Sequence, residues 1–75
     1  MSYRFYFWFK GVPENRIGGP WWARDFATLD HMIDFKRAML PFLYAWVFDD
    51  REYLEELDPM NVRPRENLQV SFAHN

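Results

Sequence analysis

The chain has 75 residues, a formal net charge of −2 and no cysteine. Its length allows one small domain (residues 1–75), and the lack of cysteine excludes disulfides and thiolate metal sites. No transmembrane helix is expected, since the longest apolar run, residues 42–48, is far shorter than the roughly 20 residues required. The N-terminus lacks the pattern of a signal peptide, so we expect a cytoplasmic protein without a membrane partner.

Residues 3–10 read Tyr-Arg-Phe-Tyr-Phe-Trp-Phe-Lys and predict the first strand of a sheet. Alternation gives this strand an apolar face made of Tyr3, Phe5, Phe7 and Phe9. The opposite face is aromatic and cationic, and consists of Arg4, Tyr6, Trp8 and Lys10. Phe rings on the first face can form the core of a short chain without disulfides.

Residues 11–20 contain all three glycines and two prolines, and they predict a loop. Residues 21–26 then predict a second strand, antiparallel to the first. Adjacent side chains of a strand point to opposite faces, so Trp21 and Trp22 cannot both point inward. One of the two is therefore expected at an edge or in solvent.

A long helix is predicted over residues 29–40, because Thr28 is a suitable N-cap and the apolar residues that follow form one stripe. Pro41 ends this helix. Residues 42–48 predict a buried strand whose smaller face, made of Leu43, Ala45 and Val47, is expected to lie under the helix.

Between Asp49 and Asp58 there are six acids and one base, a local net charge of −5, whereas the rest of the chain carries +3. Asp49 followed by Glu52 resembles a capping box, which predicts a short acidic helix over about residues 50–58. Residues 68–73 alternate and predict a final strand. The expected fold is α+β: a three- or four-stranded, mainly antiparallel sheet with the long helix on one face.

No set of residues predicts catalysis. His31 and Asp34 share a helix face, but two carboxylates with one histidine at helical spacing occur often by chance, and neither serine lies in a nucleophile motif. We therefore expect a protein that is not an enzyme and that needs neither metal nor cofactor.

The leading hypothesis is a protein-interaction module with an acidic docking surface. The residues expected to contact the partner are Asp50, Glu52, Glu55, Glu56, Asp58, Trp8, Trp21 and Trp22. The expected partner is a host protein with a basic surface, and a nucleic-acid-binding protein would qualify because the acids could stand in for phosphates.

Two alternatives remain open. Rings beside cations on a sheet are typical of single-stranded nucleic-acid binders, which makes Arg4, Tyr6, Trp8 and Lys10 an alternative site, although the net negative charge makes direct nucleic-acid binding the weaker hypothesis. The surplus rings could also form the seam of a structural homodimer.

In size and composition the chain resembles the small accessory proteins of bacteriophages and mobile elements, anti-CRISPR proteins among them. It is short, free of cysteine and rich in aromatic residues, with one charged patch. This resemblance implies an inhibitor or regulator that blocks a host protein by occupying its surface.

Overall fold

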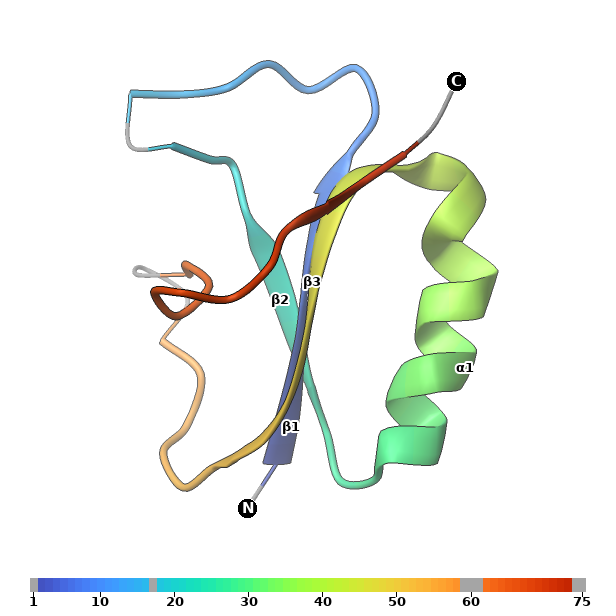
Figure 1. Cartoon of the computed structure of the whole chain (residues 1–75), viewed down its shortest axis with the longest axis vertical. Helices are drawn as coiled ribbons and strands as arrows, with labels where there is room; N and C mark the ends of the chain where they lie inside the picture. Colours follow the sequence, from blue (N-terminus) through green and yellow to red (C-terminus); the bar gives the residue numbers. More distant parts are fainter. Residues whose placement is uncertain (1, 17, 59–61, 74–75) are drawn as a thin grey trace.

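The computed structural model describes residues 2–16, 18–58 and 62–73. The elements in chain order are β1 (Ser2–Phe9), β2 (Trp22–Phe26), α1 (Leu29–Met39), the 3₁₀ turn η1 (Leu40–Phe42), β3 (Leu43–Tyr53) and β4 (Ser71–Phe72). The four strands form one antiparallel sheet in the order β2-β1-β3-β4. Because α1 lies along one face of this sheet (Figure 1), the predicted α+β class is confirmed.

The helix begins and ends close to where the sequence predicts. The Thr28 hydroxyl accepts a hydrogen bond from the His31 N–H at 3.2 Å, which satisfies one of the free donors of the first turn. Asp30 lies in the first turn and Lys36 and Arg37 in the last, an order that suits the helix dipole. Pro41 falls in η1, directly after the helix.

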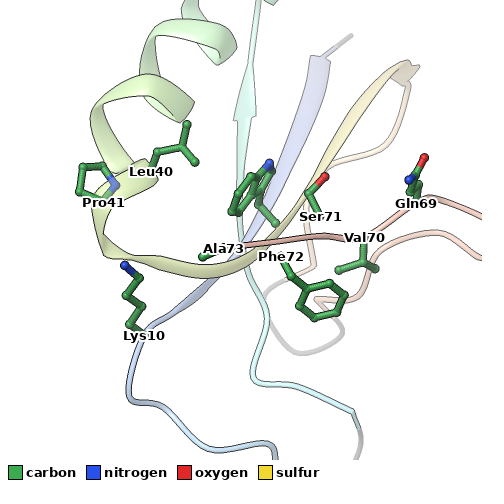
Figure 2. Close-up of a pocket in the computed structure, with 9 residues that line it drawn as sticks. Lys10, Leu40, Pro41, Gln69, Val70, Ser71, Phe72 and Ala73 are labelled. Carbon is green, nitrogen blue, oxygen red and sulfur yellow. The ribbon is translucent and has the colours of Figure 1, made fainter. Parts of the chain in front are cut away.

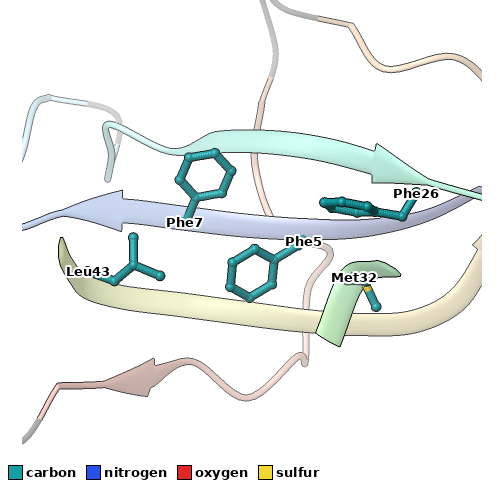
Figure 3. Packing of buried hydrophobic residues seen from close by; sticks show 5 residues of the cluster. All are labelled: Phe5, Phe7, Phe26, Met32 and Leu43. Atoms are coloured by element: carbon teal, nitrogen blue, oxygen red, sulfur yellow. The ribbon is translucent and has the colours of Figure 1, made fainter. Parts of the chain in front are cut away.

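The core between α1 and the sheet is built mainly from phenylalanine rings. Its fully buried residues lie on three strands and the helix (Figure 3), and they are Phe5, Phe7, Phe26, Met32 and Leu43. Phe35 of α1 contacts the rings of Phe5, Phe7 and Phe26 at centroid distances of 6.0, 5.5 and 5.3 Å. The predicted apolar face of β1 thus packs under the helix.

The opposite face of the sheet is buried as well, under a segment without regular secondary structure. Tyr6 is 2% exposed, Val47 1% and Tyr53 4%. The chain after β3 crosses this face on the side away from α1 (Figure 1), and it contributes Val62, Leu68 and Val70 to a second core. The domain therefore has three layers, in which the sheet lies between a helix and an irregular segment.

The predicted short acidic helix is wrong. β3 continues through Asp49 to Tyr53, which pairs with Ser2, and residues 54–58 lie outside regular secondary structure. Asp49 does not cap a helix, because its buried carboxylate accepts hydrogen bonds from the Tyr53 hydroxyl and from the Arg51 N–H. Tertiary burial has overridden a local capping pattern.

The faces predicted for β3 are also wrong, and a bulge is the reason. Trp8 pairs with Ala45 but Phe9 pairs with Leu43, so Tyr44 is an extra residue in β3. The bulge reverses the alternation, so that Leu43 contacts the helix-side core while Val47 belongs to the second core. The final strand is shorter than the predicted residues 68–73, because Leu68 and Val70 pack on the second core.

Candidate functional site: an acidic segment mounted on a buried polar network

Tyr53, the last residue of β3, is clamped between two arginines. The guanidinium carbon of Arg4 lies 3.8 Å from the centre of its ring, and that of Arg65 lies 3.5 Å away. Two cationic groups this close to one ring centre fit only on opposite faces of it. The Tyr53 hydroxyl donates to Asp49 Oδ2 at 2.7 Å and shares a 2.9 Å hydrogen bond with the hydroxyl of Tyr6. The side chain is therefore held from every direction.

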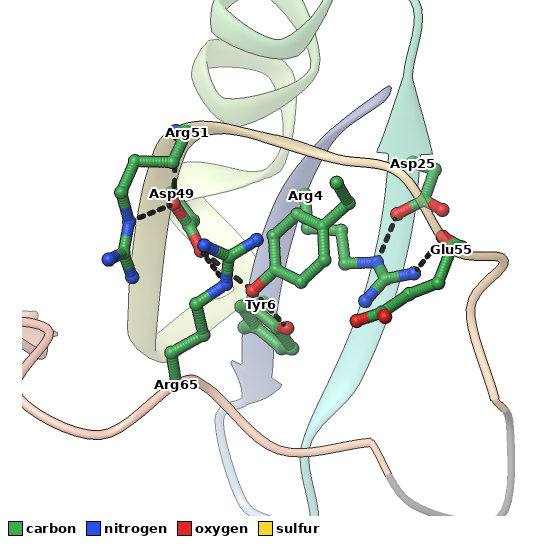
Figure 4. A network of polar contacts seen from close by, with 8 residues as sticks. Arg4, Tyr6, Asp25, Asp49, Arg51, Glu55 and Arg65 are labelled. Carbon is green, nitrogen blue, oxygen red and sulfur yellow. Dashed lines mark hydrogen bonds and ion pairs between the residues drawn. The ribbon is translucent and has the colours of Figure 1, made fainter. Parts of the chain in front are cut away.

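Asp49 is the anion at the centre of this network. Its side chain is 0% exposed, and Nε of Arg51 and of Arg65 lie 3.5 and 3.3 Å from its oxygens (Figure 4). A carboxylate removed from water is tolerable only when charge and hydrogen bonds compensate it, and here two cations, a hydroxyl and a backbone N–H do so.

The network keeps Tyr53 protonated and Arg4 charged. Burial, together with the hydrogen bonds to Tyr6 and Asp49, raises the pKa of Tyr53 well above its ordinary value. Burial lowers the pKa of the Arg4 guanidinium, but the hydrogen bond and attraction to Asp25 outweigh it, so the net shift is upward. The network is thus a fixed structural device near neutral pH.

Arg4 also fixes the backbone that follows β3. Its Nε donates to Asp25 Oδ1 and its Nη2 to the carbonyl oxygen of Glu55, both at 2.8 Å (Figure 4). Leu54 lies between the clamped Tyr53 and this fixed carbonyl. Neighbouring residues of an extended chain point in opposite directions, so the burial of Tyr53 directs Leu54 outward, where it is 82% exposed.

The acidic segment (residues 50–58) carries carboxylates on both sides of this leucine in the sequence. The five acids predicted to contact a partner are all exposed, and they are Asp50, Glu52, Glu55, Glu56 and Asp58. A pocket of about 290 Å³ is lined by residues 55–58 and by the network, and Arg63 lines it beside Arg4 and Arg65. These arginines come from outside the segment, so the local negative charge is smaller than the composition suggested.

The three predicted tryptophan anchors do not share one surface. Trp8 is only 8% exposed, and its indole N–H donates to the Val12 carbonyl at 2.6 Å. Trp21 is half-buried against the second core, whereas Trp22 is 57% exposed and lies edge-on to Phe9 on the helix side.

The tryptophans and the acidic segment lie at opposite ends of the sheet. Trp22 pairs with Phe7, near the end of β1, whereas Tyr53 pairs with Ser2 at its start. Five residues along a strand span about 17 Å. The structure therefore separates the predicted partner-binding residues into two places.

The aromatic-cationic face of β1 is not an open platform. Arg4 is 5% exposed, Tyr6 2% and Trp8 8%, because the chain after β3, together with Val12 and Trp21, covers that face. Only Lys10 of the four predicted residues is exposed. Alternation identified the face correctly, but it could not show that distant parts of the chain cover it.

The predicted contact residues include Trp22 but not three other exposed rings. Phe42, Tyr44 and Phe72 are 59%, 46% and 53% exposed. A groove of about 740 Å³ runs between η1 and β4, and Figure 2 shows Phe72 pointing away from Leu40 and Pro41 at its edge. Tyr44 could be found only by locating the bulge.

The described residues contain no cluster of three or more His, Cys, Asp or Glu side chains that could hold a metal ion. His31 and Asp34 are both exposed on α1. No helix within the described part of the chain is long and apolar enough to cross a membrane. Comparisons with protein-family models, curated proteins and solved structures find no match.

Proposed function

We propose that this protein is a non-enzymatic interaction module that captures the basic surface of a partner protein through Leu54 and the acidic segment. The observation that carries the proposal is the 82% exposure of a leucine that is flanked by exposed carboxylates. Interaction hot spots lie in well-packed pockets inside a rim that excludes water; tryptophan, tyrosine and arginine are the commonest residues there, and an anchored leucine can take the same place.

The buried network supports this proposal by holding the acidic segment in place. The side chain of Tyr53 and the carbonyl of Glu55 are both bound to Arg4, on either side of Leu54. A contact residue that is already ordered loses little conformational freedom on binding, which raises affinity. Exposed apolar residues on soluble domains are common, but an anchored one within an acidic segment favours a defined partner.

The charge of the segment determines the chemistry of that partner. Carboxylates at the rim of an interface act chiefly on the rate of association and on the choice of partner, and salt screens them over about 10 Å. We therefore expect a partner with arginine and lysine around a small apolar pocket. Occlusion of that basic surface is the proposed mode of action, in keeping with the resemblance to phage accessory proteins.

The test is a charge reversal with a matched control. The variant carries Glu52→Lys, Glu55→Lys and Glu56→Lys, and the control carries Asp30→Lys, Asp34→Lys and Glu66→Lys, which are equally exposed and change the net charge equally. Proteins captured from a native host extract at physiological salt are identified by mass spectrometry for the wild type and both variants.

The proposal expects one protein that the wild type and the control both retain and that the acidic-segment variant loses. Thermal melting must be nearly unchanged in the acidic-segment variant, because its three side chains are exposed. The control should melt slightly lower, because Asp30→Lys places a cation in the first turn of α1. Equal capture by all three proteins contradicts the proposal, as does a partner whose contact surface is acidic.

Direct binding of single-stranded nucleic acid and homodimer formation stay predictions. For nucleic acid, the rings that could stack on bases are Tyr44 and Phe72, since Tyr6 and Trp8 are buried. Both alternatives enter below as outcomes of an experiment on those rings.

A further inference from the structure

A row of four aromatic rings crosses the sheet on the face opposite α1, at the end far from the acidic segment. Trp21 contacts Trp8, Trp8 contacts Tyr44, and Tyr44 contacts Phe72, at centroid distances of 5.6, 5.3 and 5.6 Å. Each contact is edge-on, with interplanar angles of 80°, 66° and 71°. Rings arranged edge to face leave a ridged surface rather than a flat one. We call this set the aromatic row.

Two hollows open beside the aromatic row, with Trp8 and Tyr44 lining both. One, of about 460 Å³, reaches Trp21 and Phe72, and the other, of about 370 Å³, reaches Val12 and Pro13. The bulge in β3 creates this arrangement, because it places Tyr44 beside Trp8 instead of on the helix side. Tyr44 is 46% exposed, and its hydroxyl makes no hydrogen bond to any described residue.

One charged group of the described chain lines both hollows. Glu14 is exposed and makes no ion pair within the described ranges. Arg65, the cation at the larger hollow, is occupied by Asp49 and by the ring of Tyr53. The charge available to a ligand is therefore negative, which favours a cationic ligand and opposes one that carries phosphates.

A segment of the same chain crosses this face of the sheet. The segment that crosses it contains Arg63, Pro64 and Arg65, and it runs across the face without strand pairing. Pro64 is half-buried and lines the larger hollow with Trp8 and Trp21, while Arg65 stacks on Tyr53. A proline from a basic segment of the same chain thus lines one of the two hollows, beside two rings of the row.

We propose that the aromatic row, with Glu14, binds a proline-rich peptide that carries a basic residue. Such peptides adopt the polyproline II helix in advance, so they lose little entropy on docking, and they bind in grooves lined by aromatic rings. The proline rings lie in the hollows on either side of Tyr44, whose hydroxyl donates to a peptide carbonyl. The basic side chain pairs with Glu14. This surface is separate from the acidic segment and does not depend on its function.

The test uses three probes on the full chain. They are a short proline-rich peptide with an arginine at each end, the same peptide with alanine in place of every proline, and oligothymidylate. Binding is followed by the backbone and indole N–H resonances in NMR titrations. The first peptide is expected to shift the Trp8 indole, Val12, Tyr44 and Phe72, and the other two probes are expected to leave them unmoved.

Substitutions separate what the exposed rings, the Tyr44 hydroxyl and the Glu14 charge each contribute to peptide binding. Tyr44→Ala and Phe72→Ala are each expected to weaken binding about tenfold, the effect of truncating a hot-spot ring. Phe42→Ala is the matched control, because this ring is equally exposed and lies outside the row. Tyr44→Phe reports the hydroxyl alone, and Glu14→Gln should weaken the arginine peptide while leaving a version with uncharged ends unaffected.

Several results overturn the proposal. Equal binding of the alanine peptide means nonspecific apolar contact, and shifts with oligothymidylate that grow in Glu14→Gln mean a nucleic-acid site. A dimer in light scattering that Tyr44→Ala dissociates means that a second copy covers the row. Binding that is unchanged in Tyr44→Ala and Phe72→Ala places the peptide elsewhere. None of these results bears on capture of a basic partner by the acidic segment.

Discussion

Asp49 is the buried anion of the polar network that holds Tyr53, the residue next to Leu54. Its carboxylate is fully buried and faces Arg51, Arg65 and the Tyr53 hydroxyl. The two arginine side chains are 54% and 32% exposed, so water can compensate them in part if the anion is removed. The main loss is then that of the hydrogen bonds to a charged acceptor.

We predict that Asp49→Asn lowers the free energy of unfolding by about 2 kcal/mol, because a neutral amide replaces the charged acceptor of the Tyr53 hydroxyl and the Arg51 N–H. Urea unfolding followed by tryptophan fluorescence measures the change. Asp50→Asn is the matched control, since Asp50 is the adjacent acid and is exposed, and it should change stability by less than about 0.5 kcal/mol. Equal effects of the two substitutions would show that the network contributes little.

Tyr53 makes stability depend on pH on the alkaline side. Its pKa in the folded protein is raised above the ordinary value of 10.0 by burial and by its bonds to Tyr6 and Asp49. Above that ordinary pKa the unfolded chain loses the phenolic proton and the folded chain keeps it. The folded state then binds more protons, so the free energy of unfolding falls as pH rises.

The expected measurement is a plateau of stability below about pH 10, followed by a decline at higher pH. Tyr53→Phe keeps the ring between Arg4 and Arg65 but has no proton to lose, so its decline should be shallower. The variant itself should be less stable at neutral pH by about 1 kcal/mol, for the lost hydrogen bonds. An identical alkaline slope in both proteins contradicts this assignment.

At the scale of the element, α1 is the unit whose boundaries depend most on local sequence. Thr28→Ala should lower stability by about 1 kcal/mol, because the N–H of His31 loses its acceptor. In a domain of this size that corresponds to about 5 °C in melting temperature. Thr28→Ser keeps the acceptor and should melt like the wild type. Melting curves followed by circular dichroism distinguish the two variants.

Elements with strong local signals could be predicted from the sequence, and elements determined by distant contacts could not. The apolar alternation of β1 and the cap and proline around α1 located those two elements. The capping-box pattern at Asp49 favoured a helix, but pairing of Tyr53 with Ser2 and the ion pair to Arg65 kept this stretch extended. No local pattern contains either contact.

The exposure of the acids in the candidate site could be predicted from the sequence. The exposure of Leu54 could not. The acids of residues 50–58 are exposed, as their composition indicated. Leu54 was not among the predicted contact residues, and the extended geometry after Tyr53 is what directs it into solvent. The aromatic row was not predicted because it requires the bulge at Tyr44.

At the scale of the whole molecule, the sheet carries two different surfaces at its two ends. One end presents Leu54 and acids, and the other presents the aromatic row with Glu14. The layer of irregular chain after β3 connects them, because its residues cover the polar network at one end and line the larger hollow at the other. One small domain could in this way hold two partners at once.

The most direct test of the central claim is photo-crosslinking from the position of Leu54. A diazirine analogue of leucine is placed there, and the matched control carries the analogue in place of Phe42, which is also exposed and lies in η1, outside the acidic segment. We predict that position 54 crosslinks to the captured partner at a segment rich in arginine and lysine, and that position 42 does not. Crosslinks from position 42 alone, or from position 54 to a segment without basic residues, would contradict the account.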